Sequence, residues 1–159
     1  MERVAGIDRI GVIGAGQMGN GIAHVAAMAG YQVSLSDISQ AALDKAKATI
    51  EKNLSRQVRK ERITDDQAQA ALGRLLLTTE MSALGDAQLV IEAATENEGL
   101  KFKIFEQLSK VAHPEALFAS NTSSISITQI AAHTDRPERT MGMHFMNPVP
   151  VMKLVEEIT

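Results

Sequence analysis

Cysteine and tryptophan are absent from the 159 residues, and aromatic residues make up only 3% of them. Without cysteine, the chain cannot form a disulfide, a thiol nucleophile or a thiolate zinc site, and we expect no metal site. The few aromatic rings argue against surfaces that stack bases or sugars. No apolar run approaches the roughly 20 residues of a membrane span, and the charged first nine residues do not resemble a secretory signal. We therefore expect a soluble, cytoplasmic protein.

An excess of charge of one sign is also lacking. There are 16 Lys and Arg residues against 19 Asp and Glu residues, which gives a net charge of -3. A dedicated nucleic-acid binder would normally be basic, so we expect no nucleic-acid partner. Hydrophobic residues make up 45% and charged residues 22% of the chain, as in an ordinary folded domain.

Strand-like and helix-like segments alternate along the chain. We predict strands over 10–13, 31–37, 75–78, 89–93, 117–120, 141–145 and 153–158, and helices over 19–29, 39–60, 64–74, 98–111 and 127–132. Such alternation predicts an α/β fold of the Rossmann type, a doubly wound and mainly parallel sheet with helices on both faces. The pair 39–60 and 64–74 is too long for a simple crossover, so we expect a helical hairpin that projects beyond the sheet. Thr64 and Gln67 would begin its second helix as a capping box.

A glycine-rich turn follows the first predicted strand and opens the first helix. Its sequence, Gly14-Ala15-Gly16-Gln17-Met18-Gly19, matches the GxGxxG pattern of dinucleotide-binding turns. Gly14 would permit the tight turn, Gly16 would allow a pyrophosphate to approach, and Gly19 would let the helix pack closely. The phosphates would then lie at the positive end of the helix dipole. A glycine turn without any ligand is the alternative.

An acidic residue ends the second predicted strand, where a carboxylate would accept hydrogen bonds from the adenosine ribose. This residue is Asp37, 18 residues after Gly19. Because its charge would repel a 2′-phosphate, it favours NAD over NADP as the cofactor. FAD uses the same kind of turn and is not excluded by the pattern.

Basic residues recur at steps of three and four along the hairpin. Lys52, Arg56, Arg59 and Lys60 share one helix face, and Arg62 follows. A solvated helix face is one explanation of this pattern. The other is an anchor for a phosphate-rich ligand distinct from the dinucleotide.

Two further polar clusters lie near predicted strand ends. Residues 120–124 are five consecutive small polar residues at the edge where ligands of parallel sheets bind, although a helix N-cap would explain one of them. His144 lies in an apolar strand, and Glu156 follows in the next one. If the bend at 147–150 folds these strands together, a carboxylate could orient the imidazole as a general base. Glu157 is an alternative partner, because the strand register decides which acid faces inward.

Four motifs stand out along the chain: Gly11-Val-Ile-Gly-Ala-Gly-Gln-Met-Gly19, Val90-Ile-Glu-Ala-Ala-Thr-Glu-Asn97, Ser120-Asn-Thr-Ser-Ser124 and Met143-His-Phe-Met-Asn-Pro-Val-Pro-Val-Met-Lys-Leu-Val-Glu156. Together they resemble the L-3-hydroxyacyl-CoA dehydrogenase family, and within it the bacterial 3-hydroxybutyryl-CoA dehydrogenases. The resemblance implies interconversion of a 3-hydroxyacyl-CoA and a 3-oxoacyl-CoA with NAD(H). It extends over residues 8–159.

The resemblance also implies roles for individual residues. His144 would be the catalytic base, Glu156 rather than Glu157 would orient it, and Ser123 would bind the 3-oxygen of the substrate. The nicotinamide half of the cofactor site would include Glu96, Lys101 and Asn121. The CoA-contacting positions of the hairpin would be Asn53 and Lys60, beside Arg56 of the basic face.

The resemblance places residues 1–159 in an NAD-binding domain. Family members continue into a helical domain that forms a homodimer and closes the substrate cleft, and this chain ends at Thr159. We therefore expect the full-length protein to be a homodimer. Two other functions stay open: a dinucleotide-binding module without catalysis, and a dehydrogenase of a free hydroxy acid. The His144–Glu156 motif argues against the first, and the basic hairpin against the second.

Overall fold

A single parallel sheet organises the computed structural model, which describes residues 6–95, 97–121 and 126–143. Its strands are β1 (Arg9–Ile13), β2 (Gln32–Ser36), β3 (Leu75–Thr78), β4 (Leu89–Glu92), β5 (Leu117–Ser120) and β6 (Thr140–Gly142). They lie in the order β3-β2-β1-β4-β5-β6, and every neighbouring pair is parallel. The strand order reverses between β1 and β4, as in the doubly wound Rossmann fold, so the predicted fold class is confirmed.

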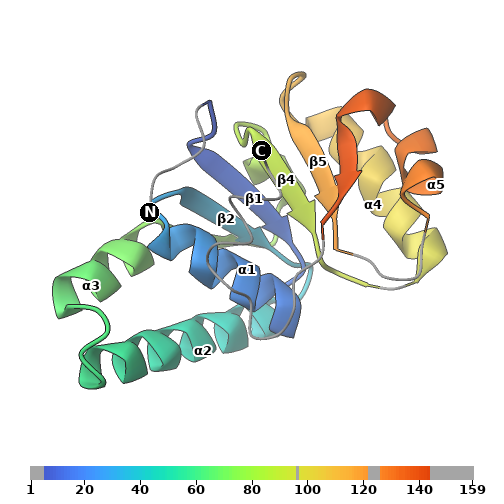
Figure 1. Cartoon of the computed structure of the whole chain (residues 1–159). Helices are drawn as coiled ribbons and strands as arrows, with labels where there is room; N and C mark the ends of the chain where they lie inside the picture. Colours follow the sequence, from blue (N-terminus) through green and yellow to red (C-terminus); the bar gives the residue numbers. More distant parts are fainter. Residues whose placement is uncertain (1–5, 96, 122–125, 144–159) are drawn as a thin grey trace.

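Helices cover both faces of this sheet (Figure 1). One core lies between the sheet and α1 (Gln17–Met28), α2 (Gln40–Arg59) and α3 (Asp65–Gly73). A second core lies under α4 (Glu98–Val111) and α5 (Ile127–Ala132). Strand β4 serves both, because Ile91 faces the first core and Val90 the second. Its four residues are all buried, as expected of a central strand in a parallel sheet.

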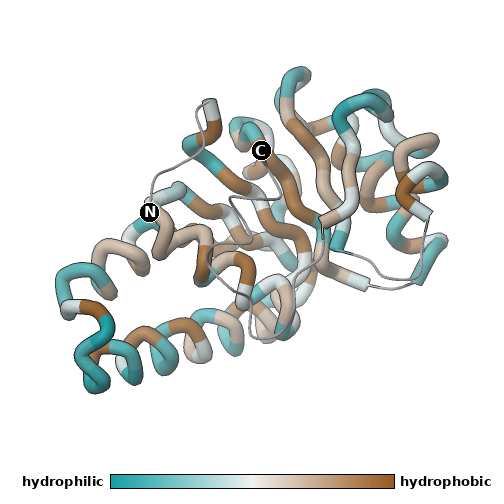
Figure 2. Tube along the Cα trace, in the orientation of Figure 1, coloured by the Kyte–Doolittle hydropathy of each residue, from teal (hydrophilic) through white to brown (hydrophobic). Residues whose placement is uncertain are grey.

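The helical hairpin of α2 and α3 packs on α1 and extends past the edge of the sheet (Figures 1 and 2). The apolar residues of α2 that face α1 are buried, namely Leu43, Ala46, Ile50 and Leu54. The predicted capping box at Thr64 and Gln67 is confirmed at the start of α3. Helix α2 ends in a Schellman motif, in which Arg62 N–H donates to Gln57 C=O and Glu61 takes a left-handed φ of 57°.

The structure differs from the sequence prediction mainly at the ends of elements. Helix α1 begins at Gln17 rather than residue 19, directly after the glycine that caps it. Two short 3₁₀ helices, η1 (Met81–Leu84) and η2 (Pro137–Arg139), were not predicted. Strand β6 covers only the start of the strand predicted over 141–145. The strand predicted over 153–158 lies outside the described residues.

Among the residues that the structure describes, His24 and Asp135 have shifted pKa values, and both lie outside the ligand edge of the sheet. Burial of His24 on α1 lowers the pKa of its imidazole, and the amide of Gln57 on α2 opposes part of that shift. A hydrogen bond from Arg136 lowers the pKa of Asp135. The buried Arg136 also donates to the carbonyl of Ala116 and lies 4.4 Å above the ring of Phe118.

Candidate functional site

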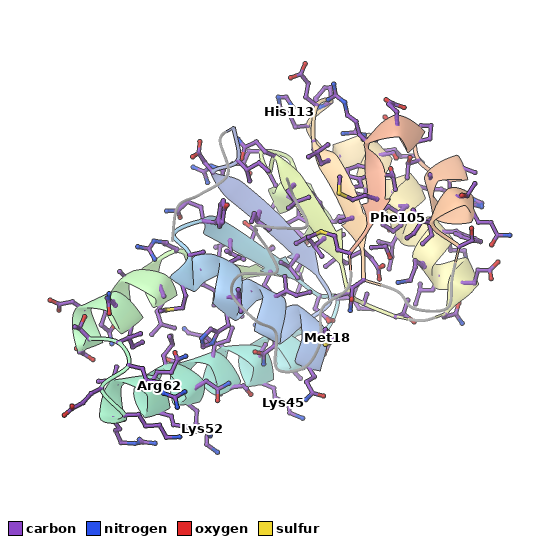
Figure 3. The ribbon with its side chains drawn as sticks, in the orientation of Figure 1. Met18, Lys45, Lys52, Arg62, Phe105 and His113 are labelled. Atoms are coloured by element: carbon purple, nitrogen blue, oxygen red, sulfur yellow. The ribbon has the colours of Figure 1, made fainter. Side chains whose placement is uncertain are left out.

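The carboxyl ends of the strands form one continuous edge. The first residue after each of β1, β4, β5 and β6 donates its N–H to the neighbouring strand: Gly14 to Ser36 at 2.8 Å, Ala93 to Ile13 at 2.8 Å, Asn121 to Glu92 at 2.8 Å and Met143 to Ser120 at 3.0 Å. Figure 3 labels Met18 at the end of α1 nearest this edge and His113 at the opposite edge. The loops after the strands therefore begin side by side, at the edge where open α/β sheets bind ligands.

The three glycines of the turn after β1 have different structural roles. Gly14 has a φ of 105°, and a Cβ there would lie 2.5 Å from Ala94 Cα. A Cβ at Gly19 would lie 1.6 Å from the carbonyl oxygen of Gly14, so α1 can pack here only on a glycine. A Cβ at Gly16 would meet no atom of the described residues within 4 Å. Packing requires glycine at two of these positions, and the third leaves open space beside the start of α1.

That open space fits the pyrophosphate of a dinucleotide. Gly16 is the N-cap of α1 and provides no side-chain cap, and the first turn of the helix has no acidic residue. Gln17 is exposed and Met18 is half-buried beside it. A helix N-terminus without acidic residues in its first turn, beside a gap that no described side chain fills, favours an anionic ligand.

Asp37 connects the end of β2 to the glycine turn. Its Oδ2 accepts a hydrogen bond from Ala15 N–H at 2.9 Å, and its Oδ1 accepts one from Ser39 N–H at 2.9 Å. The carboxylate therefore lies at the turn and fixes its backbone, while the next side chain, Ile38, is 97% exposed. The sequence placed Asp37 at this edge, but the hydrogen bond to Ala15 was not anticipated.

A buried cluster of polar side chains lies at the ends of β4 and β5. Glu92 Oε1 accepts hydrogen bonds from Lys101 Nζ at 2.6 Å and Ser120 Oγ at 2.7 Å, and Lys101 Nζ lies 3.2 Å from Ser120 Oγ. Glu92 Oε2 accepts from Ala94 N–H at 2.8 Å. All three side chains are fully buried.

The sequence analysis named Lys101 but missed Glu92 and Ser120 as its partners. One signal was available: Lys101 shares the apolar stripe of α4 with Ile104, Phe105 and Leu108, so its charge had to be buried. A buried ammonium requires an anionic partner. The structure places Lys101 on that partner, at the base of the loops after β4 and β5.

The other predicted cofactor and catalytic residues are divided between described and undescribed parts of the chain. Asn121 is half-buried directly after β5. Glu96, Ser123, His144 and Glu156 lie outside the described residues, as does Glu157. Among the residues that the structure does describe, no group of three His, Asp or Glu side chains could hold a metal ion.

The basic face of the hairpin is exposed. Lys52, Arg56, Arg59, Lys60 and Arg62 are all exposed, and Asn53 is half-buried. In Figure 3, Lys45 and Lys52 point outward from α2, and Arg62 lies near its end. Within the described part of the chain, none of these five cations has an acidic partner within 4.0 Å. The face is therefore available to an anionic ligand.

Residues 9–159 match the family described as "3-hydroxyacyl-CoA dehydrogenase, NAD binding domain". The chain belongs to this family, and its cofactor is NAD. The family predicted from the four sequence motifs is confirmed. No helix in the described residues is long and apolar enough to cross a membrane.

Two curated relatives and one solved structure show how far the similarity extends. The chain is 57% identical to a 3-hydroxybutyryl-CoA dehydrogenase of Bradyrhizobium diazoefficiens, over 96% of this chain and 52% of that protein. It is 48% identical to a 3-hydroxyadipyl-CoA dehydrogenase of Escherichia coli, over 96% of this chain and 32% of that protein. The crystal structure of (S)-3-hydroxybutyryl-CoA dehydrogenase from Ralstonia eutropha superposes with a TM-score of 0.88 at 48% identity, over 91% of this chain and 51% of that chain. This chain thus spans about half the length of the 3-hydroxybutyryl-CoA dehydrogenases that it matches.

Proposed function

We propose that the protein carrying this sequence is an NAD(H)-dependent dehydrogenase of (S)-3-hydroxyacyl-CoA, with 3-hydroxybutyryl-CoA as its substrate. The observation that carries the proposal is the open space at Gly16, beside the uncapped start of α1 and beside Asp37. It provides for a pyrophosphate and a ribose at neighbouring positions. The high identity to proteins named 3-hydroxybutyryl-CoA dehydrogenase supports the choice of substrate.

The exposed basic face supports a CoA thioester rather than a free hydroxy acid. Arg56 lies 16 residues after the start of α2, about 24 Å along the helix axis. A small hydroxy acid at the strand ends would not extend that far, whereas the phosphates of CoA are remote from the acyl group. We assign Asn53, Arg56 and Lys60 to CoA binding.

Bound NAD supplies the hydride acceptor of the reaction. In the proposed mechanism, His144 removes the proton of the 3-hydroxyl as the carbonyl forms, and Glu156 orients the imidazole and stabilises its protonated form. Ser123 hydrogen-bonds the substrate oxygen and so aligns the carbon–hydrogen bond with the cofactor. Glu96, Lys101 and Asn121 form the nicotinamide side of the site, and a homodimer in the cytoplasm is the proposed working state.

The decisive experiment compares acetoacetyl-CoA with free acetoacetate as oxidants of NADH, followed by absorbance at 340 nm, with NADH binding followed by nicotinamide fluorescence. The protein that carries this sequence should reduce the thioester and leave the free acid nearly untouched. His144→Gln should lower kcat by about 10²–10⁴-fold with NADH binding nearly intact. Glu156→Gln should act likewise, and Glu157→Gln is the matched control.

The basic face gives a second arm to this experiment. Lys60→Ala and Arg56→Ala should raise KM for acetoacetyl-CoA but not for a short thioester without a nucleotide, because a phosphate contact needs a phosphate. Reduction of free acetoacetate at the rate of the thioester would favour a dehydrogenase of free hydroxy acids. NADH binding with neither reaction would favour a binding module without catalysis.

A further inference from the structure

The buried ion pair of Glu92 and Lys101 is not explained by packing. Both side chains are fully buried, and their charged atoms lie 2.6 Å apart. Removing two charges from water is costly, and apolar side chains of similar size would usually stabilise a fold as well or better. The pair lies at the ligand edge of the sheet, so a role in ligand binding explains its charges better than packing does.

The topology places this pair under one half of a bound dinucleotide. The strand order reverses between β1 and β4, and the dinucleotide lies across that point. Gly16 and Asp37 provide for the pyrophosphate and the adenosine ribose on the β1–β2 side. The nicotinamide half then extends over the ends of β4 and β5, where Glu92 and Ser120 are the last strand residues.

The carboxylate of Glu92 binds three segments on that side. Glu92 Oε1 accepts from Lys101 on α4 and from Ser120 at the end of β5, and Glu92 Oε2 accepts from Ala94 in the loop after β4. The backbone of the same loop lies against Gly14, where a Cβ would be 2.5 Å from Ala94 Cα. A displacement of Glu92 would therefore move both nicotinamide-side loops and disturb the phosphate turn.

We propose that Glu92 is a positioning residue of the nicotinamide site, which fixes these loops and cancels the positive charge of Lys101 beneath the ring. The inference rests on the proposed function because it requires NAD at this edge. The nicotinamide ring is positively charged when oxidised and neutral when reduced. An uncompensated charge below the ring would thus bias the site toward one form, and the neutral pair removes that bias.

The test is the ratio of the dissociation constants for NAD⁺ and NADH, measured by nicotinamide fluorescence for NADH and by competition for NAD⁺. Glu92→Gln leaves the charge of Lys101 uncompensated. The dissociation constant for NAD⁺ should therefore rise by about tenfold relative to that for NADH. Lys101→Met leaves Glu92 uncompensated, so the ratio should change in the opposite direction. The double variant Glu92→Gln/Lys101→Met should return the ratio to within about twofold of the unmodified value.

Two controls separate charge from loss of structure. Ser120→Ala keeps both charges and should weaken NAD⁺ and NADH equally. Arg136→Met removes a buried cation near the opposite edge of the sheet, so it should lower thermal stability and leave the ratio unchanged. Circular dichroism establishes that each variant is folded.

The outcomes distinguish this inference from the proposed function. Opposite changes in the two single variants, cancelled in the double variant, support the charge-compensating role. If Glu92→Gln, Lys101→Met and the double variant each weakened the binding of NAD⁺ and NADH equally, the inference would be overturned. The pair would then be a structural element only. If a single variant does not fold, Ser120→Ala and the double variant decide, and an altered ratio in either one overturns the inference. An unmodified protein that binds neither form would overturn the proposed function itself.

Discussion

The two halves of the ligand edge are built from different chemistry. On the β1–β2 side, backbone groups dominate: a glycine turn, the start of α1, and Asp37 bonded to the amides of Ala15 and Ser39. On the β4–β5 side, a buried network of side chains holds the loops through Glu92. The first half depends on the absence of side chains at fixed positions. The second depends on charges that must remain paired.

The largest change in stability should follow from one added methyl group within the glycine turn, because this half of the edge depends on the absence of side chains. Gly19→Ala would place a Cβ 1.6 Å from the carbonyl oxygen of Gly14, so α1 must shift. We expect a loss of about 3 kcal/mol in the free energy of unfolding, measured by urea denaturation with circular dichroism. Gly16→Ala is the matched control, since its Cβ would meet none of the atoms in the described part of the chain. It should change stability by less than about 1 kcal/mol and weaken NADH binding. Equal stability losses for the two variants would contradict these separate roles.

The next effect concerns Asp37, whose carboxylate accepts a hydrogen bond from Ala15 in the glycine turn. Asp37→Ser should narrow the difference between NADH and NADPH affinity by about tenfold, because it removes a charge that repels a 2′-phosphate. Asp37→Asn is the control: it also removes the charge but keeps an oxygen for Ala15 N–H. Both dissociation constants follow from nicotinamide fluorescence. Equally tight binding of NADPH and NADH by the unmodified chain would mean that Asp37 does not face the ribose.

A third change tests whether the hairpin can be stabilised without affecting the edge. Glu61→Gly replaces a side chain held at a left-handed φ of 57°, and should raise the free energy of unfolding by about 1 kcal/mol. Glu51→Gly, in the exposed interior of α2, should lower it by about 1 kcal/mol. Thermal and urea unfolding measure both. NADH affinity should not change in either variant, and stabilities that change in the same direction would refute the strain at Glu61.

The smallest effect should be a pH dependence of the free energy of unfolding that arises from His24 on α1. Burial lowers the pKa of His24 below its value in the unfolded chain, about 6.5. As the pH falls below this value the unfolded chain binds the proton first, so the free energy of unfolding decreases; above pH 7 the group contributes no slope. His24→Gln should flatten the profile between pH 7 and 5, measured by urea unfolding. The exposed His113→Gln tests whether any histidine replacement has that effect, in which case the assignment to His24 would be wrong.

The same contrast explains what could be predicted from the sequence. Within the described residues, the identity of the strands and helices, the parallel sheet, the capping box at Thr64 and the glycine turn all depend on short-range patterns, and these predictions were confirmed. The partners of Lys101 lie 9 and 19 positions away from it along the chain, and no local pattern of residues encodes these contacts. The hydrogen bond from Ala15 to Asp37 likewise appears only when β1 and β2 are adjacent. The two short 3₁₀ helices were not predicted because they contain too few residues to show a periodic pattern of apolar residues.

The row of backbone hydrogen bonds along the carboxyl edge also determines how firmly the first residue of each loop is held. Gly14, Ala93 and Asn121 are each bonded through their own N–H to the neighbouring strand, so each loop is anchored at its first residue. The carboxyl edge of the sheet is therefore held in place up to and including these three residues. In hydrogen exchange, these three amides should be among the slowest to exchange and report global unfolding.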